Sequence, residues 1–193
     1  MNKIFLFSFI FLNILGFYIS GSFNSLLGRD IFTDNSYFLL ENGLNIYSVS
    51  NLYPVFTSAF FHANLIHLAM NMIALYQFGN LVLKSTSVSV FFQIFIGSLL
   101  MSSLFSLLYI YFWDSTVNVI GASGAIFGLF SFYFMYIKNF KLFLIQFIVF
   151  HAVIFAFELP IAWYAHLGGA IFGILYYLYI FRFFKKSPFQ PLN

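Results

Sequence analysis

The sequence contains no cysteine and few charged residues. Of its 193 residues, none is cysteine and only 7% are Asp, Glu, Lys or Arg. The chain therefore has no thiolate nucleophile, no cysteine-ligated iron–sulfur cluster and no disulfide. Because soluble globular domains carry about 25% charged residues, the low charge excludes an ordinary soluble domain. The net charge of +3 is too small and too dispersed to indicate nucleic-acid binding.

Apolar residues, in contrast, make up 62% of the chain. Apolar runs of about 20 residues cross a bilayer as helices, and the alternating pattern of a membrane barrel is absent. We therefore expect an all-α membrane protein, a bundle of six transmembrane helices in a single domain over residues 1–186. The expected helices cover about 4–21, 56–83, 88–113, 117–137, 142–159 and 161–184, and a short polar tail covers 187–193.

The first apolar run, Ile4 to Ile19, has two interpretations. A signal peptide would place its cleavage site at the small residues 20–22. A retained first helix is favoured, because the run is long for the apolar core of a signal peptide. The half-apolar segment from Ser22 to Pro54 has the composition of a loop that lies at the membrane interface.

Charged residues segregate between the two ends of the expected bundle. One end holds the basic residues Lys3, Lys84, Lys138, Lys141, Arg182, Lys185 and Lys186, and the other holds Arg29 with all five acidic residues. Lysine and arginine are enriched in cytoplasmic loops. We therefore expect the lysine-rich end, and with it both termini, in the cytoplasm.

A serine stands among glycines in Gly121-Ala122-Ser123-Gly124, near the start of the fourth expected helix. Glycine costs roughly 1 kcal/mol relative to alanine in a helix interior, so its repeated use here indicates that another backbone approaches closely. If the helix begins at Val117, Ser123 lies about 9 Å below the outer surface. Taken alone, the serine is better explained by a small-residue packing face.

The sixth expected helix carries His166 at a similar depth. Gly169 and Gly173 follow it on the same helix face, with the four-residue spacing of the two glycines after Ser123. Two such faces allow the helices to approach closely enough for a Ser–His hydrogen bond of about 2.6–3.2 Å. A histidine that only packs between helices explains His166 alone equally well, but the paired glycine faces favour catalysis.

The second expected helix presents His67 and Asn71 on one face, with His62 turned aside. Neutral donors directed at the serine suit an oxyanion hole, in which each donor contributes about 10²–10³ in rate. We discount a metal site and expect no cofactor, because the helices contain no HExxH motif, cysteine or carboxylate at this depth. His151 in the fifth helix is interpreted as a packing or interfacial residue.

Together these residues resemble the rhomboid family of intramembrane serine proteases. The matching motifs are His62-x4-His67-x3-Asn71, Gly121-x-Ser123-Gly124 and Ala165-His166-x2-Gly169-x3-Gly173, in the family's order over nearly the whole chain. The resemblance implies that Ser123 is the nucleophile and His166 the general base and acid. It also implies that His67 and Asn71 assist the Ser123 backbone amide in stabilising the oxyanion, with His62, Gly121, Gly124, Gly169 and Gly173 in supporting positions.

The resemblance further implies the minimal six-helix bacterial form, in the bacterial cytoplasmic (inner) membrane. Its substrates would be single-pass transmembrane proteins, cut near the outer face within the lipid bilayer. Many members carry Trp-Arg in the first loop, where this chain has Tyr53-Pro54. The alternative functions are a catalytically silent relative that binds transmembrane helices, or a polytopic transporter or scaffold.

The fifth helix and the turn after it are the expected lateral gate for the substrate. Pro160 weakens the junction with the sixth helix. The bulky side chains of Phe155, Phe157 and Trp163 could part without breaking polar contacts. For any one of them, an ordinary lipid-facing position is an equally good explanation.

Overall fold

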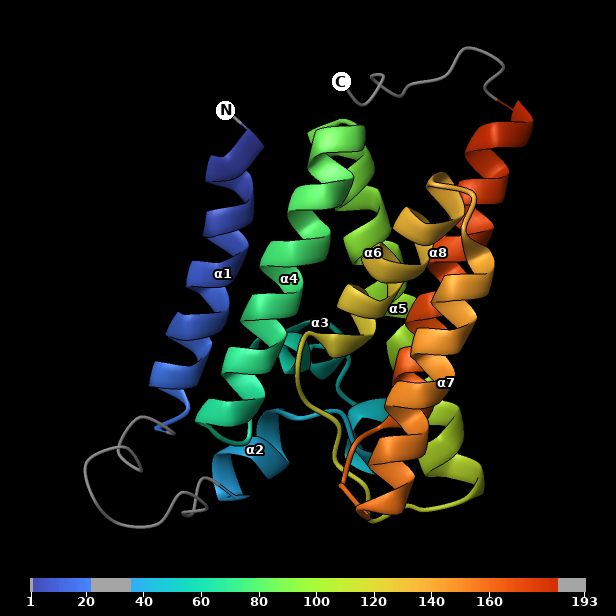
Figure 1. Ribbon diagram of the computed structural model, residues 1–193. Coiled ribbons are helices and arrows are strands. Elements are labelled where there is room, and N and C mark those ends of the chain that lie inside the picture. Colours follow the sequence, from blue (N-terminus) through green and yellow to red (C-terminus); the bar gives the residue numbers. More distant parts are fainter. Residues whose placement is uncertain (1, 22–35, 184–193) are drawn as a thin grey trace.

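The computed structural model describes residues 2–21 and 36–183, and its fold is all-α, as predicted (Figure 1). In this part of the chain the long helices are α1 (Asn2–Ile19), α4 (Leu65–Ser85), α5 (Val88–Phe112), α6 (Ser123–Tyr136), α7 (Phe140–Ala156) and α8 (Trp163–Phe183). The short segments α2 (Ser36–Asn42), η2 (Ile46–Val49), α3 (Pro54–Thr57) and η3 (Ser58–Phe60) lie between α1 and α4. Helices α4 and α5 are long and apolar enough to cross a membrane by length and composition alone, and α1, α6 and α7 are shorter apolar helices.

Successive long helices run in alternating directions, so the start of α1 and the end of α8 lie at the same end of the bundle (Figure 1). The described charges follow this division. Lys3, Lys84, Lys138 and Lys141 belong to that end, and Glu41, Asp114 and Glu158 belong to the opposite end. The predicted charges at 29, 30, 34, 185 and 186, like the predicted tail over 187–193, lie outside the described residues.

Two helices begin later than predicted, each for a local reason. Helix α4 starts at Leu65 instead of 56, because Pro54 opens a separate short helix and the Asn64 side chain caps α4 by accepting a hydrogen bond from the His67 N–H. Helix α6 starts at Ser123 instead of 117, because Gly121 has a φ of +105°, which a right-handed helix does not adopt. The fifth and sixth predicted helices shift by only two or three residues at each end that the structure describes.

The connection between α5 and α6 runs back into the bundle. Its residue Val119 forms an isolated antiparallel bridge with Leu44, and the Gly121 N–H donates a 2.9 Å hydrogen bond to the carbonyl of Ser58. Helix α6 therefore begins part-way along the bundle (Figure 1). The position of Ser123 therefore depends on this loop. The predicted depth of about 9 Å assumed a helix that begins at residue 117, whereas α6 begins at Ser123.

At the start of this connection, Asp114 makes a local turn. Its carboxylate accepts hydrogen bonds from the hydroxyl and the N–H of Thr116, at 2.6 and 2.9 Å. These bonds lower the pKa of the Asp114 carboxyl, because they favour its charged form. Asp114 therefore keeps its negative charge to a lower pH than a free aspartate does.

Helix α1 packs into the bundle. Leu6 and Phe17 are buried, and the Phe9 ring contacts the rings of Phe91 and Phe95 with centroids 5.7 and 4.7 Å apart. In a bilayer such packing stabilises the bundle through van der Waals contacts, because lipid tails are as apolar as these side chains. Retention of this first helix stays a prediction.

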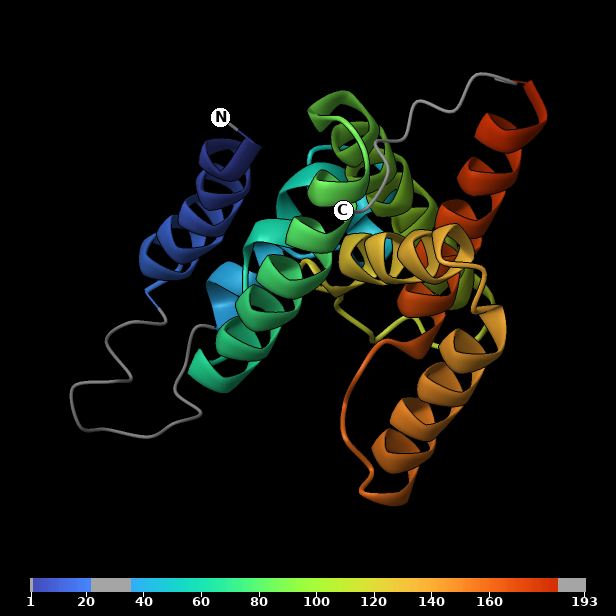
Figure 2. The ribbon, with the colours of Figure 1, turned by 45° about the horizontal axis from the view of Figure 1, so that its top comes forward.

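Helix α6 occupies the centre and α7 the edge. Helix α6 packs against α4, α5, α7 and α8, whereas the main neighbour of α7 is α6. Figure 2 shows α7 on the side of the bundle away from α1. Of the side chains of α7, those of Phe143, His151 and Ile154 are buried. Helix α7 is therefore held by few side chains, and one of them is polar.

Candidate active site

Ser123 is the first residue of α6. A helix N-terminus carries a partial positive charge, and its first backbone N–H groups have no acceptor within the helix. The side chain is partly exposed, so a substrate can reach its hydroxyl. Negative charge that develops at this position is therefore stabilised by the helix that presents the serine.

His166 lies in the first turn of α8 and reaches Ser123. Its Nε2 atom is 2.8 Å from the Ser123 Oγ atom, and the side chain is only 2% exposed. Its ring stacks on the ring of Phe127, with centroids 4.2 Å apart and an angle of 22° between the planes. Phe127 stands one turn after Ser123, so α6 carries both the predicted nucleophile and the ring that supports its histidine.

Close contact between α6 and α8 makes this hydrogen bond possible. A Cβ atom placed on Gly169 would overlap the carbonyl oxygen of Gly124, and one on Gly173 would overlap that of Gly128. The two backbones therefore touch at both levels, as the paired spacing predicted. A Cβ atom on Gly124 or Gly128 would overlap a serine side chain of α5. These two positions of α6 therefore have no room for a side chain.

A further histidine, His151 of α7, belongs to the same cluster. Its Nε2 atom lies 3.0 Å from Nδ1 of His166, and its Nδ1 atom lies 2.8 Å from the carbonyl oxygen of Phe147. The interpretation of His151 as a packing residue is therefore incomplete. No sequence signal pointed to this contact, because His151 has no glycine face or motif beside it and its partner lies on another helix.

His67 lies beside Gly121, two residues before Ser123. A Cβ atom on Gly121 would stand 2.8 Å from the Cε1 and Nε2 atoms of the His67 ring. The buried His62 ring meets the His67 ring edge-on, with centroids 4.9 Å apart. The Asn71 side-chain amide donates to the His67 carbonyl at 2.9 Å. His67 and His62 therefore lie against the glycine that leads into the nucleophile, and Asn71 is hydrogen-bonded to the backbone of His67.

No metal site accompanies these histidines in the described part of the chain, where no group of three or more His, Cys, Asp or Glu residues is placed to hold an ion.

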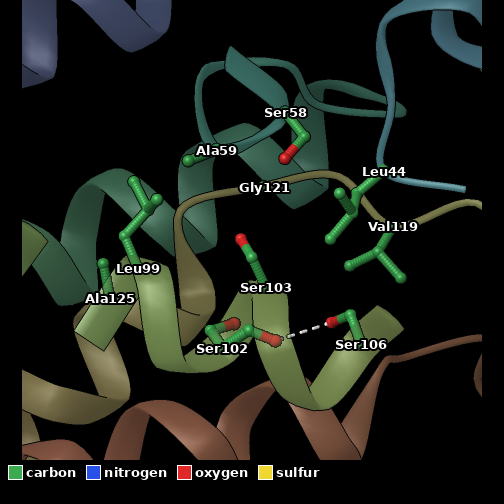
Figure 3. A pocket seen from close by; sticks show the side chains of 10 residues that line it. All are labelled: Leu44, Ser58, Ala59, Leu99, Ser102, Ser103, Ser106, Val119, Gly121 and Ala125. Carbon is green, nitrogen blue, oxygen red and sulfur yellow. Dashed lines mark hydrogen bonds between the residues drawn. The ribbon is translucent and has the colours of Figure 1, made fainter. Parts of the chain in front are cut away.

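Behind Gly121 lies a small cavity of about 20 Å³, which has room for one water molecule. Figure 3 shows the hydroxyls of Ser58 and Ser103 directed into it from opposite sides. The Ser106 hydroxyl donates to the Ser102 carbonyl at 2.9 Å.

The three predicted gate residues lie where α7 passes into α8. Phe155 and Phe157 are 62% and 73% exposed. The Phe155 ring contacts the Trp163 ring, and Trp163 contacts Tyr109 of α5, with centroids 6.5 and 6.1 Å apart. Two of the three side chains are therefore neighbours on the outside of the bundle, at the acidic end.

A family model for the rhomboid domain matches residues 49–183, which is more than half of the chain. The chain belongs to the rhomboid family. It is also 32% identical over 161 residues to the "Rhomboid protein 1, mitochondrial" of Saccharomyces cerevisiae, in an alignment that covers 75% of this chain and 46% of the yeast protein. The chain therefore spans less than half the length of that relative. Rhomboid proteins are multi-pass membrane proteins, so the predicted all-α membrane fold is confirmed.

In general, rhomboids are intramembrane serine proteases that act on transmembrane substrates, although some members are inactive. The chain has Tyr53-Pro54 where the resemblance leads us to expect Trp-Arg. The Tyr53 hydroxyl donates to the backbone carbonyl of Glu41 at 3.0 Å, and Pro54 is the first residue of α3. The pair therefore ties the end of α2 to the start of α3.

Proposed function

We propose that this rhomboid is an active intramembrane serine endopeptidase that works with a dyad of Ser123 and His166. The observation that carries the proposal is the 2.8 Å contact between Nε2 of His166 and Oγ of Ser123, at the N-terminus of a central helix. Silent members of such a family commonly lack one of the two residues, and this chain keeps both. The dyad contains no carboxylate, so the base must be oriented by neutral groups.

The reaction follows from this geometry in two steps. In the first, the Ser123 oxygen forms a bond to the scissile carbonyl carbon while His166 Nε2 takes the hydroxyl proton. His166 then returns this proton to the leaving amine as the C–N bond breaks, leaving an acyl-enzyme. In the second step, His166 takes a proton from water as the water oxygen attacks the ester, and gives it back to Ser123.

We propose that the oxyanion of both steps is stabilised by the Ser123 backbone amide together with His67 and Asn71. Two observations support this role. The Ser123 amide belongs to the first turn of α6, where N–H groups have no acceptor within the helix. The His67 ring lies against Gly121, immediately before the serine. Each donor would contribute about 10²–10³ in rate.

We propose that the substrates are single-pass transmembrane proteins, which reach Ser123 by moving past α7. A backbone carbonyl in a helix is sequestered by its own hydrogen bonds, so the substrate must unwind before it is cut. Lysines mark the end of the bundle that holds the start of α1 and the end of α8, which favours a cytoplasmic position for that end. Cleavage is then expected near the opposite, outer end of the substrate helix. The bacterial inner membrane stays a prediction, since the yeast relative is a mitochondrial protein.

A fluorophosphonate probe tests this proposal most directly. We expect the probe to label the purified protein in detergent and to leave Ser123→Ala unlabelled. A single-pass reporter substrate in the same detergent should be cut by the wild type only. Labelling that persists in Ser123→Ala would contradict the assignment of the nucleophile. No labelling and no cleavage in the wild type would favour a silent binder or a transporter.

A further inference from the structure

His151 extends the contact between Ser123 and His166 into a longer chain of hydrogen bonds. The chain runs from the Phe147 carbonyl to Nδ1 of His151, at 2.8 Å, and from Nε2 of His151 to Nδ1 of His166, at 3.0 Å. It ends with Nε2 of His166 and the Ser123 hydroxyl, at 2.8 Å. A backbone carbonyl of α7 is thereby connected to the nucleophile at the start of α6.

The donor and acceptor of each hydrogen bond follow from the Phe147 carbonyl, which stands at one end of this chain. A carbonyl oxygen can only accept, so Nδ1 of His151 carries a proton. A neutral imidazole has a single N–H, so Nε2 of His151 accepts and Nδ1 of His166 donates. Nε2 of His166 then presents its lone pair to the Ser123 hydroxyl. This is the tautomer that can act as a general base.

The surroundings of His151 favour the neutral ring that this argument uses. His151 is buried, and its ring lies 4.2 Å from the ring of Phe147, 5.3 Å from that of Phe150 and 5.6 Å from that of Phe127, between centroids. A charged ring in such an apolar environment is costly unless it is paired with an opposite charge. The aromatic neighbours supply none.

We propose that His151 is a positioning residue that holds His166 in the tautomer able to accept the Ser123 proton. The inference rests on the proposed protease function and adds a third member from a different helix. His151 acts through His166, because its contacts are with the far nitrogen of that ring. When His166 takes the proton, its Nδ1–H continues to donate to His151, so the positive charge that forms is stabilised without a second proton transfer.

Loss of the acceptor would change the balance between the two tautomers. If Nδ1 of His166 has no acceptor, the ring gains by moving its proton to Nε2, where it can donate to the Ser123 oxygen. In that form the ring cannot take the serine proton. The expected defect is therefore a lower population of competent enzyme, which lowers kcat and leaves substrate binding almost unchanged.

A matched pair of variants separates this role from packing. In His151→Gln, the side-chain oxygen reaches the region of the lost Nε2 atom and can accept, whereas His151→Met has the same length without a comparable acceptor. With a single-pass substrate in lipid nanodiscs, we expect His151→Met to lower kcat about 10- to 100-fold with little change in KM. His151→Gln should recover most of kcat.

Nitrogen NMR reads the tautomer without relying on catalysis. The chain has four histidines, so ¹⁵N-histidine labelling gives few signals, which substitutions assign. We expect His166 to be protonated at Nδ1 in the wild type and in His151→Gln, and to shift towards the Nε2-protonated form in His151→Met. Ile154→Ala, which removes another buried side chain of α7, should lower thermal stability and leave the His166 signals in place.

Equal kcat values and equal His166 signals in the Gln and Met variants would overturn the positioning role. The same would follow if Ile154→Ala reproduced the tautomer shift, because packing would then explain it. These outcomes are distinct from failure of the protease assignment, which would appear as an inactive, unlabelled wild type. The NMR comparison remains decisive in that case, since it needs no turnover.

Discussion

The Cα atom of Gly169 lies so close to the carbonyl oxygen of Gly124 that a methyl group does not fit between them. Gly169→Ala should therefore push α8 away from α6 and separate His166 from Ser123. Overpacking of this kind costs about 1–3 kcal/mol, and misplacement of a catalytic group by 1 Å can cost about 100-fold in rate. We expect a lower unfolding temperature in detergent together with a loss of cleavage. Gly169→Val should be worse.

The exposed Leu175 of the same helix provides the control for this change. Leu175→Val introduces a β-branched side chain on the outer face of α8, away from α6. Its cleavage rate and unfolding temperature should both stay close to those of the wild type. A Gly169→Ala protein with wild-type activity would show that cleavage does not depend on the close contact between α6 and α8.

Removal of either dyad residue should abolish cleavage without unfolding the protein. In Ser123→Ala the attacking oxygen is absent, and in His166→Ala no group takes its proton, so each change should lower kcat by about 10⁴-fold or more. Unfolding temperatures, measured beside the cleavage rates, should change little for the serine variant. Near wild-type cleavage by either variant would remove the dyad mechanism.

Substitution of Gly121 tests the proposed oxyanion donors. In Gly121→Ala the new methyl group would stand 2.8 Å from the His67 ring, on a residue whose φ of +105° an L side chain rarely adopts. Displacement of His67 should lower kcat by about 10²–10³, the usual effect of one lost donor. Cleavage kinetics of the folded, purified variant measure this effect.

Gly79→Ala in α4 is the matched glycine control. Its new methyl group would stand 2.7 Å from the end of the Leu6 side chain and 3.2 Å from Cε2 of Phe91, so only apolar side chains outside the proposed site must shift. Its kcat should therefore remain near that of the wild type. If Gly121→Ala loses stability but its folded fraction keeps a normal kcat, His67 is not an oxyanion donor.

The gate hypothesis predicts a dependence on substrate size. The double variant of Phe155→Ala and Phe157→Ala removes exposed side chains from the outer end of α7 and one contact with Trp163. It should speed cleavage of a transmembrane substrate more than hydrolysis of a small soluble ester, because only the former needs α7 to move aside. Phe112→Ala, an exposed aromatic change on α5, should alter neither rate. Equal acceleration of both substrates would contradict a gate at this position.

The sequence was sufficient to predict the helical fold and the contact between Ser123 and His166. Glycine spacing predicted that contact because small residues four apart describe a helix face, and two such faces can pack only against each other or against small side chains. The first residues of the helices were harder to predict. A single positive φ at Gly121 ends the helical pattern that hydropathy extends to Val117, since hydropathy does not report backbone conformation.

The role of His151 could not be predicted from the sequence for a related reason. Its partner, His166, lies on another helix, and the hydrogen bond between them depends on the angle at which α7 meets the bundle. No periodic pattern records that angle. The short helices around Pro54 were also missed, because their apolar residues continued the apolar run of α4.

Because few side chains hold α7 against the bundle, substrate entry and catalysis would have to follow one another in a fixed order. A substrate that displaces α7 to reach Ser123 also draws His151 away from His166, so the base is weakest while the serine is most accessible. Reactivity would return only when the helix closes again with the unwound peptide inside. Such an interlock would protect the acyl-forming serine from lipid esters and other passing electrophiles. It would also make closure around the substrate, and not its arrival, the step that starts chemistry.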